Sequence, residues 1–414
     1  MKLYLDYQAT TPVDPRVLEK MLPYFTQVFG NPSSQDHSWG WAASRAVEKA
    51  RTQVGQLLNA HPSEIFFTSG ATESNNWAII GLIRRWLREA PELSDSELSA
   101  SRLSDHQNSP PALNRPLIHV LTSQIEHKSV LAPLTYLQEE LGSRLSVTYL
   151  KPNRWGQVTL DQIREAKTSA TRLLSLHWAH NELGTIQAIS EIAEWTHQNK
   201  IYFHSDATQA VGKIPMDLSQ VPVDLISFAS HKLYGPKGVG SLFIRQKNPR
   251  VSLDPLIFGG GQERTLRAGT LNVPGIVGLG EACEISTAEM RQHSELGQRS
   301  SPIYKLRSRL LEGLKRVSPP FHLNSHPEHH LPHALSLTFP GHPMAEILAE
   351  TSHLGMSAGS ACGSGEMSGS PVLRAIGLSE PDAKSTIRLS LGRWTTEAEV
   401  DFVIESFAKA FSGR

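Results

Sequence analysis

The chain contains 414 residues, of which 39% are hydrophobic, so it can bury a large core, and its length favours two structural units. Its 40 basic and 40 acidic side chains cancel, so the composition indicates neither a nucleic-acid partner nor a membrane surface as partner. No apolar run approaches the roughly 20 residues that span a bilayer, and the N-terminal stretch MKLYLDYQATTP does not read as a signal peptide. The two cysteines are too few to form a disulfide framework. We therefore expect a cytoplasmic protein.

Apolar strand-like runs alternate with amphipathic segments of helical length over much of the chain. EIFFTS precedes NWAIIGLIRRWL, LIHVLTS precedes SVLAPLTYLQEEL, and TRLLSLHWA precedes ISEIAEWTHQN; IYFHSD, DLISFAS and GSLFI follow. Trp77, Ile80 and Ile83 recur at helical spacing in the first amphipathic segment. The alternation predicts an α/β fold with a mainly parallel sheet covered by helices on both faces.

Two departures from this alternation suggest the domain organisation. Residues 90–116 are rich in Ser and Pro and lack apolar periodicity, so we expect an inserted surface loop. After about residue 260, long helical stretches surround two short strands, ALSLTFP and STIRLSLGRW. This half is predicted to form a smaller α+β domain.

Polar turns follow the predicted strands, where ligands of parallel sheets bind. In FTSGATESNN a helix begins after small residues, and its backbone N–H groups with Ser69 and Thr72 could hold a phosphate; an ordinary capped helix is the alternative. Asp206 ends an apolar strand and could cap a helix or lie under a ligand. His127 and Asn181 also follow strands, and a lone histidine is more often structural than catalytic.

The stretch SHKLYGPKGVG contains the most informative lysine. A Walker loop needs its lysine after the glycines, but Lys232 precedes Gly235 and Gly238, so that interpretation fails. A lysine directly after a strand, restrained by a Gly-Pro turn, is typical of a Schiff-base-forming amine. Lys237 is interpreted as a solvated charge. Amine, acid and anion cup, each after its own strand, together suit a cofactor with an aldehyde, a ring nitrogen and a phosphate.

The two cysteines have different surroundings in the sequence. Cys283 lies in the apolar stretch VGLGEACEI and is predicted to be a buried thiol. Cys362 lies among glycines and serines in MSAGSACGSGEMSGSP, where it is either an exposed loop residue or a nucleophile. The histidine-rich stretch at residues 322–333 could bind metal, but its prolines favour a surface loop.

SHKLYGPKG, SGATES, DATQ, GGGQERTLRAGT, GSAC and IRLSLGR occur in an order that resembles the cysteine desulfurases. These are class-V pyridoxal-phosphate enzymes of fold type I, and the similarity runs from LDYQATTPVDP to SLGRWTTEAEVD. The resemblance implies a large cofactor-binding domain at 14–260 with a mainly parallel seven-stranded sheet flanked by helices. It implies a small domain, 1–13 and 261–414, that carries the cysteine loop.

The resemblance also implies a role for each matching residue. Lys232 would hold pyridoxal 5′-phosphate covalently, Asp206 would pair with its ring nitrogen, and His127 would stack on the ring and move protons. Cys362 would accept sulfur from L-cysteine as a persulfide, and could transiently ligate an iron–sulfur cluster; no other metal is implied. The remaining contacts would be Gln209 and Asn181 to the ring oxygen and substrate, Ala71, Thr72, His231 and the homodimer partner's Thr270 to the phosphate, and Arg388 to the substrate carboxylate.

The sequence departs from the family pattern near the lysine and near Asn181. Ala229 stands where a hydroxyl residue is common, so either Ser230 takes over that phosphate contact or the cup has one donor fewer. HWAHNELG replaces paired asparagines, which leaves the role of His180 open. The loop after Cys362 resembles the long-loop group, whose cysteine delivers sulfur to an acceptor such as an iron–sulfur scaffold.

Three functions are compatible with these residues. A cysteine desulfurase would give L-alanine and a persulfide. A cystine C–S lyase or a selenocysteine lyase would need Lys232 but no persulfide-bearing thiol. A non-catalytic member of an assembly complex would not need the full set of lysine, aspartate, histidine, arginine and cysteine that the chain retains.

Overall fold

The computed structural model describes residues 1–89, 117–296, 300–357 and 369–412. The predicted inserted loop at 90–116 lies outside the described residues, and so does Cys362. No helix in the described ranges is long and apolar enough to cross a membrane.

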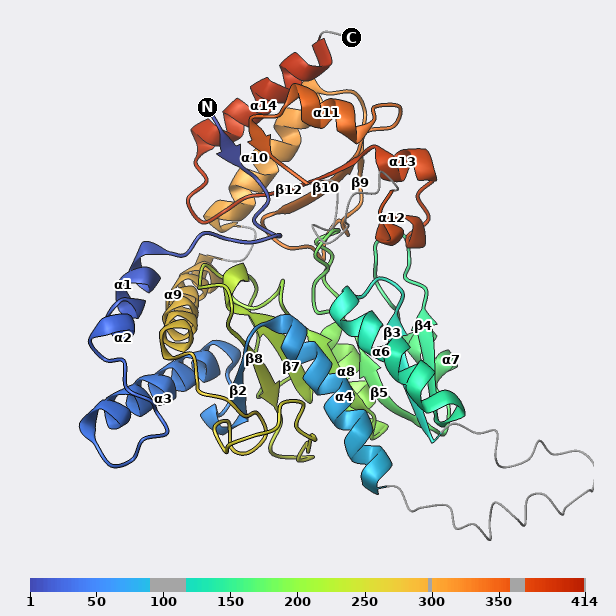
Figure 1. Cartoon of the computed structure of the whole chain (residues 1–414). Coiled ribbons are helices and arrows are strands. Elements are labelled where there is room, and N and C mark those ends of the chain that lie inside the picture. The colour runs from blue at the N-terminus through green and yellow to red at the C-terminus, as the bar shows by residue number, and fades with distance from the viewer. Residues whose placement is uncertain (90–116, 297–299, 358–368, 413–414) are drawn as a thin grey trace, which may run out of the picture.

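A seven-stranded sheet forms the centre of the larger unit (Figure 1). Its strand order is β2-β8-β7-β6-β5-β3-β4; β7, β6, β5, β3 and β4 are parallel, and β8 is antiparallel to both β2 and β7. This confirms the predicted mainly parallel sheet. The strands are β2 (Ile65–Thr68), β3 (Ile118–Ser123), β4 (Leu145–Leu150), β5 (Thr171–Ser175), β6 (Tyr202–Asp206), β7 (Leu225–Ala229) and β8 (Gly240–Ile244).

Helices cover both faces of this sheet. Successive side chains of a strand point to opposite faces, and in these strands the side chains on both faces are apolar. Leu173 and Leu242 face a core shared with α4 (Ala71–Glu89) and α6 (Lys128–Leu141). Their neighbours Leu174 and Phe243 face the opposite core, which is shared with the helices α3 (Ser38–Leu58), α7 (Leu160–Ala166), α8 (Ile189–Gln198) and α9 (Val273–Leu296). Strands buried on both faces explain the continuous apolar runs in the sequence.

The smaller unit lies beyond one end of the large sheet (Figure 1). Its antiparallel sheet has the order β12-β10-β9, formed by Thr386–Ser390, Ala334–Thr338 and His322–Leu323. Leu337, Phe339 and Ile387 pack there against Leu310 and Phe407, which belong to α10 (Pro302–Val317) and α14 (Glu397–Ser412). The unit also contains α11 (Met344–Glu350), α12 (Pro371–Ala375) and α13 (Glu380–Lys384).

The N-terminal segment connects the two units. β1 (Leu3–Tyr4) pairs in parallel with β11 (Leu354–Gly355), and Asp6 forms a bridge with Ser390 at the end of β12. The chain then passes the active-site region and enters α1 (Pro15–Met21) and α2 (Pro23–Thr26), beside α3 and α9. The pairing favours assigning residues 1–13 to the small unit, although the exact bounds of that unit stay a prediction.

Helix α9 packs with the large unit although it follows residue 260. Ile276, Leu279 and Cys283 belong to the same core as α3, and Cys283 is fully buried. A Cβ atom at Gly280 would lie 2.6 Å from Ala50 Cα, so this glycine permits the close approach of the two helices. The predicted boundary near residue 260 stays a prediction, and the packing of α9 favours a later one.

Candidate active site

A cavity of about 570 Å³ lies at the carboxyl ends of the parallel strands. It brings together nine of the residues predicted from the sequence, and Arg388 of β12 reaches it from the smaller unit. These residues are Ala71, Thr72, His127, Asn181, Asp206, Gln209, His231, Lys232 and Arg388. Residues separated by more than 300 positions in the chain therefore meet at one sheet edge.

Lys232 reaches this cavity from a short 3-10 helix, Ser230–Lys232, directly after β7. Its Nζ donates hydrogen bonds to the backbone oxygens of Gln8, at 2.7 Å, and Ala9, at 2.5 Å. The N-terminal segment thus holds the amine in place. The following turn requires a positive φ of 65° at Tyr234, whose backbone N–H donates to Thr11.

Asp206 is the last residue of β6 and is 7% exposed. Its Oδ2 accepts a hydrogen bond from Asn75 Nδ2 at 2.7 Å, and its Oδ1 accepts one from the Thr208 backbone N–H at 3.0 Å. These two donors fix the orientation of the carboxylate at the end of β6. Asp206 is therefore suited to face a protonated ring nitrogen.

His127 caps the N-terminus of α6, where its Nδ1 accepts a hydrogen bond from the Ser129 backbone N–H at 3.1 Å. The same Nδ1 lies 2.7 Å from Ser129 Oγ. Because Nδ1 accepts the backbone hydrogen bond, the proton of the neutral ring resides on Nε2. The capping interaction fixes the orientation of the imidazole at the cavity wall.

The start of α4 lines the cavity at the position of the predicted anion cup. Gly70, Ala71 and Thr72 line the cavity where the first backbone N–H groups of this helix lack helical acceptors. A Cβ atom at Gly240 would lie 2.6 Å from Gly70 Cα, so only glycine permits β8 to approach the cup. His231 also lines the site, and burial and the charges of Lys232, Lys237 and Lys213 lower its pKa to about 4. His231 is thus a neutral hydrogen-bonding group at pH 7.

Arg388 is 2% exposed and is held by both units. Its Nη2 forms an ion pair with Asp6 Oδ1 at 2.6 Å, and its Nη1 donates to the backbone oxygen of Asn181 at 2.8 Å. Within the described residues its Nε has no hydrogen-bond partner. The guanidinium is therefore fixed, with donor capacity left for a carboxylate.

Two predicted residues do not line this cavity. Ser230 is fully buried, and its Oγ lies against Gly235, where an added Cβ would collide with it. The packing gives no support to a phosphate contact from Ser230. Thr270 is exposed and does not line this chain's own cavity, and its predicted contact with a partner's phosphate site stays a prediction.

The segment that carries Thr270 is anchored next to the anion cup. Arg267 Nε forms an ion pair at 2.8 Å with Glu73, which also accepts a hydrogen bond from the Ser69 backbone N–H. The buried pair of Arg51 and Glu263, with Nη2 and Oε1 2.8 Å apart, fixes the same segment to β2. The segments GGGQERTLRAGT and SGATES, which are far apart in the sequence, are therefore in direct contact through Arg267 and Glu73.

Sequence reasoning missed three residues of the site. Asn75 orients Asp206, and its position three residues after Thr72, in the first turns of the helix that begins the predicted phosphate site, was the available signal. Ser129 accepts a hydrogen bond from Asn75 and contacts His127. Gln8 is 1% exposed and lines the cavity, yet both polar atoms of its side-chain amide lack partners within the described residues.

His180, whose role the sequence left open, has structural contacts. Its Nδ1 accepts hydrogen bonds from the backbone N–H groups of Glu182 and Leu183, and its Nε2 lies 2.9 Å from the backbone oxygen of Ile125. Burial, with the nearby His177, holds the pKa of His180 well below its usual value. A neutral His180 therefore shapes the loop that presents Asn181.

The donor set fits pyridoxal phosphate. The cavity contains an amine, a buried acid held by two hydrogen bonds, a helix N-terminus and an amide without partners, and their chemistry matches the aldehyde, ring nitrogen, phosphate and polar substituents of that cofactor.

The sequence matches the model of one family, aminotransferase class V, over residues 3–99 and 110–403. The chain is 42% identical to the human protein named cysteine desulfurase over 403 residues, which covers 97% of this chain and 80% of the human one. A solved structure titled NifS-like protein has a TM-score of 0.83 and 35% identity, and the match covers all of both chains. Another, titled SspA in complex with cysteine, has a TM-score of 0.75 and 36% identity, covering 96% of this chain and 100% of the other.

Fold and site together define an enzyme of fold type I in the class-V aminotransferase superfamily. Within that superfamily, the chain belongs to the cysteine desulfurase family.

Proposed function

We propose that this protein is a pyridoxal-phosphate-dependent cysteine desulfurase that converts L-cysteine to L-alanine and leaves the sulfur as a persulfide on Cys362. The observation that supports this most is the position of Lys232 Nζ in one cavity with Asp206 and the start of α4. The relative solved with cysteine bound supports the choice of substrate.

Each part of the cofactor has a matching group in the cavity. Lys232 would hold the aldehyde carbon, Asp206 would pair with the ring nitrogen, and the backbone N–H groups at the start of α4 would hold the phosphate together with Thr72 and His231. His127 would contact the ring, and Gln209 and Asn181 would contact the ring oxygen. When bound, the cofactor supplies an electron sink for the bonds at the substrate α-carbon.

The protein's own groups then bind the substrate and move its protons. Arg388 orients the substrate carboxylate with the donor capacity that Asp6 and Asn181 leave. The amine of Lys232 would remove the α-proton of the substrate as a general base. His127 returns protons from the other side of the site, with Nε2 as the nitrogen that carries them.

Cys362 takes the sulfur in the last step. Its thiolate attacks the substrate sulfur, a sulfur–sulfur bond forms, the carbon–sulfur bond breaks, and the β-carbon gains a proton to become the methyl group of alanine. Cys283 cannot take this role because it is fully buried in the α9 core.

The proposal includes partners and location. The enzyme acts as a homodimer in which Thr270 completes the partner's phosphate site, and an acceptor such as an iron–sulfur scaffold takes the sulfur. The balanced charge of 40 basic and 40 acidic residues and the low cysteine content support action in the cytoplasm without nucleic acid.

Mass spectrometry after incubation with L-cysteine tests the proposed function. We expect one added sulfur on the Cys362 peptide, with alanine as the amino-acid product, and neither in the Cys362→Ser variant. Pyruvate as the product would instead indicate a C–S lyase, and undiminished alanine formation by Cys362→Ser would show that Cys362 is not the sulfur acceptor. Either result would overturn the proposal.

A further inference from the structure

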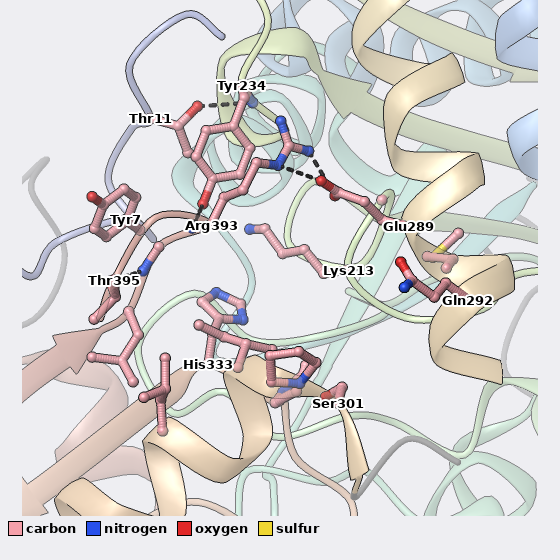
Figure 2. A pocket seen from close by; sticks show the side chains of 18 of the residues that line it. Tyr7, Thr11, Lys213, Tyr234, Glu289, Gln292, Ser301, His333, Arg393 and Thr395 are labelled. Atoms are coloured by element: carbon pink, nitrogen blue, oxygen red, sulfur yellow. Dashed lines mark hydrogen bonds and ion pairs between the residues drawn. The ribbon is translucent and has the colours of Figure 1, made fainter. Parts of the chain in front are cut away.

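A second cavity of about 360 Å³ lies between the two units, and Figure 2 shows side chains that line it. It is bounded by the end of α9, the start of α10, the segment after β12 and the chain around Lys213. Along the N-terminal segment, Tyr7 and Thr11 line this cavity whereas Gln8 and Ala9 line the active site. The volume is in the range of small-molecule sites.

Two buried polar groups border this cavity, each with a side-chain atom that lacks a hydrogen-bond partner within the described residues. His333 is 6% exposed and Ser301 is 3% exposed, yet His333 Nε2 and Ser301 Oγ have no hydrogen-bond partner in the part of the chain that the structure describes. Figure 2 shows Lys213 extending into the space between them and Arg393. Buried polar groups are normally satisfied, so these atoms indicate a missing ligand.

The charges around the cavity leave a positive excess at Lys213. Arg393 is neutralised by Asp14 at 2.7 Å and by Glu289 at 2.9 Å. Within the described residues Lys213 forms no ion pair, and its Nζ donates only to the amide oxygen of Gln209, at 2.9 Å. Burial, assisted by the charges of Lys232 and Arg388, lowers the pKa of Lys213 to about 7, which reflects an ammonium without a counter-ion.

Burial, with the charges of Lys213 and Arg307 nearby, also holds the pKa of His333 well below its usual value, so its ring is neutral and can hydrogen bond. The rest of the wall is largely apolar. Its apolar members are Met290, Pro302, Ile303, Leu306, Pro332 and Leu391.

We propose that this cavity is a binding site for a small amphipathic carboxylate, with the carboxylate at Lys213, His333 and Ser301 and an apolar body between α9 and α10. The carboxylate supplies the counter-charge that Lys213 lacks and acceptors for its donors. The apolar walls disfavour a fully polar anion such as free phosphate. The proposal is independent of the reaction assigned to the neighbouring cavity.

The two cavities are connected by a short series of hydrogen bonds. Lys213 Nζ donates to Gln209 Oε1, Gln209 Nε2 donates to the Gln8 backbone oxygen at 2.9 Å, and Lys232 Nζ donates to that same oxygen. An anion at Lys213 therefore lies three hydrogen bonds from the active-site amine.

Calorimetric titration of the holoenzyme with octanoate tests the site, with octanamide as its neutral counterpart. We expect one octanoate per chain with a Kd of about 1 mM or tighter, as suits a ligand of about ten heavy atoms. Octanamide should bind at least about tenfold more weakly, because it lacks the charge that faces Lys213.

Variants of α10 locate the binding. Leu306→Trp fills the cavity and should weaken octanoate binding at least about tenfold, whereas Lys305→Trp, on the exposed side of the same helix, should change it less than about twofold. Ile303→Trp provides a second filling variant if Leu306→Trp does not fold. Absence of octanoate binding, equal binding of octanamide, or full binding by a folded filling variant would overturn the proposal.

Discussion

Asn75 shows how a single side chain sets the chemistry of this site. It is fully buried in α4, and its amide nitrogen donates to both Asp206 and Ser129. Ser129 in turn contacts His127, so one amide orients both the acid and the imidazole of the site. The sequence predicted the acid and the imidazole, but not the residue that connects them, because the contact depends on α4 and α6 lying side by side.

We predict that Asn75→Ala weakens cofactor binding by about 10- to 100-fold, because a hydrogen bond to a buried charge contributes about 1.5–3 kcal/mol. Asn76→Ala is the control, since Asn76 bonds to backbone oxygens and not to Asp206. Titration of the apoenzyme with pyridoxal phosphate, followed by absorbance, measures both. Equal affinity for the two variants would contradict this role for Asn75.

The two cysteines should differ sharply in reactivity. Burial raises the pKa of the Cys283 thiol far above its usual value, so almost no thiolate exists at pH 8 and iodoacetamide cannot reach the sulfur. We expect labelling of the native protein to modify Cys362 alone, and Cys283 only after unfolding. Peptide mapping provides the measurement, and rapid labelling of Cys283 in the native protein would refute this packing of α9.

At the scale of the elements, sequence periodicity is sufficient to predict strands and helices but not to assign every helix to a unit. Alternating strands and amphipathic segments predicted the sheet and its covering helices, because strands buried on both faces appear in the sequence as continuous apolar runs. Periodicity could not assign α9 to a unit, since an apolar helix is equally compatible with either core. The contact with α3 decides this, and it depends on Gly280.

At Gly280, helix propensity and packing predict opposite effects for a change to alanine. An exposed Gly→Ala change in a helix stabilises by about 0.5–1 kcal/mol, but here the new Cβ would lie 2.6 Å from Ala50 Cα. We therefore expect Gly280→Ala to destabilise by about 1–3 kcal/mol. In urea denaturation the control Ala288→Gly, on the exposed side of α9, should lose only about 0.5–1 kcal/mol. A stabilised Gly280→Ala would show that α3 and α9 are not in close contact.

At the scale of the molecule, residues from both units and from the N-terminal segment line one cavity. Nine predicted residues meet in one cavity, whereas Thr270 is held at the surface by a segment tied to Glu73 and Arg51. Motif order predicted that the nine residues come together. It could not predict the second cavity, because Lys213, Ser301, Leu306 and His333 lie outside the motifs; His333 is buried, although it belongs to the histidine-rich stretch expected to form a surface loop.

Mixed dimers test whether Thr270 acts on the partner's site. In a dimer of a Lys232→Ala chain and a Thr270→Ala chain, the intact lysine faces an intact threonine only if the threonine acts across the interface. We expect such mixed dimers to bind the cofactor with wild-type affinity at one site per dimer. The Thr270→Ala homodimer should bind about 10-fold more weakly or worse. Weak binding by the mixed dimer would place Thr270 in its own chain's site.

The identity of the lysine that carries the cofactor is the central claim. Reduction of the holoenzyme with borohydride, followed by peptide mapping, measures it directly. We expect the reduced cofactor on Lys232 and on neither Lys213 nor Lys237, although burial lowers the pKa of Lys213 to about 7 and Lys213 is connected to Lys232 through Gln209 and Gln8. A cofactor found on Lys213, or on no lysine of this cavity, would contradict it.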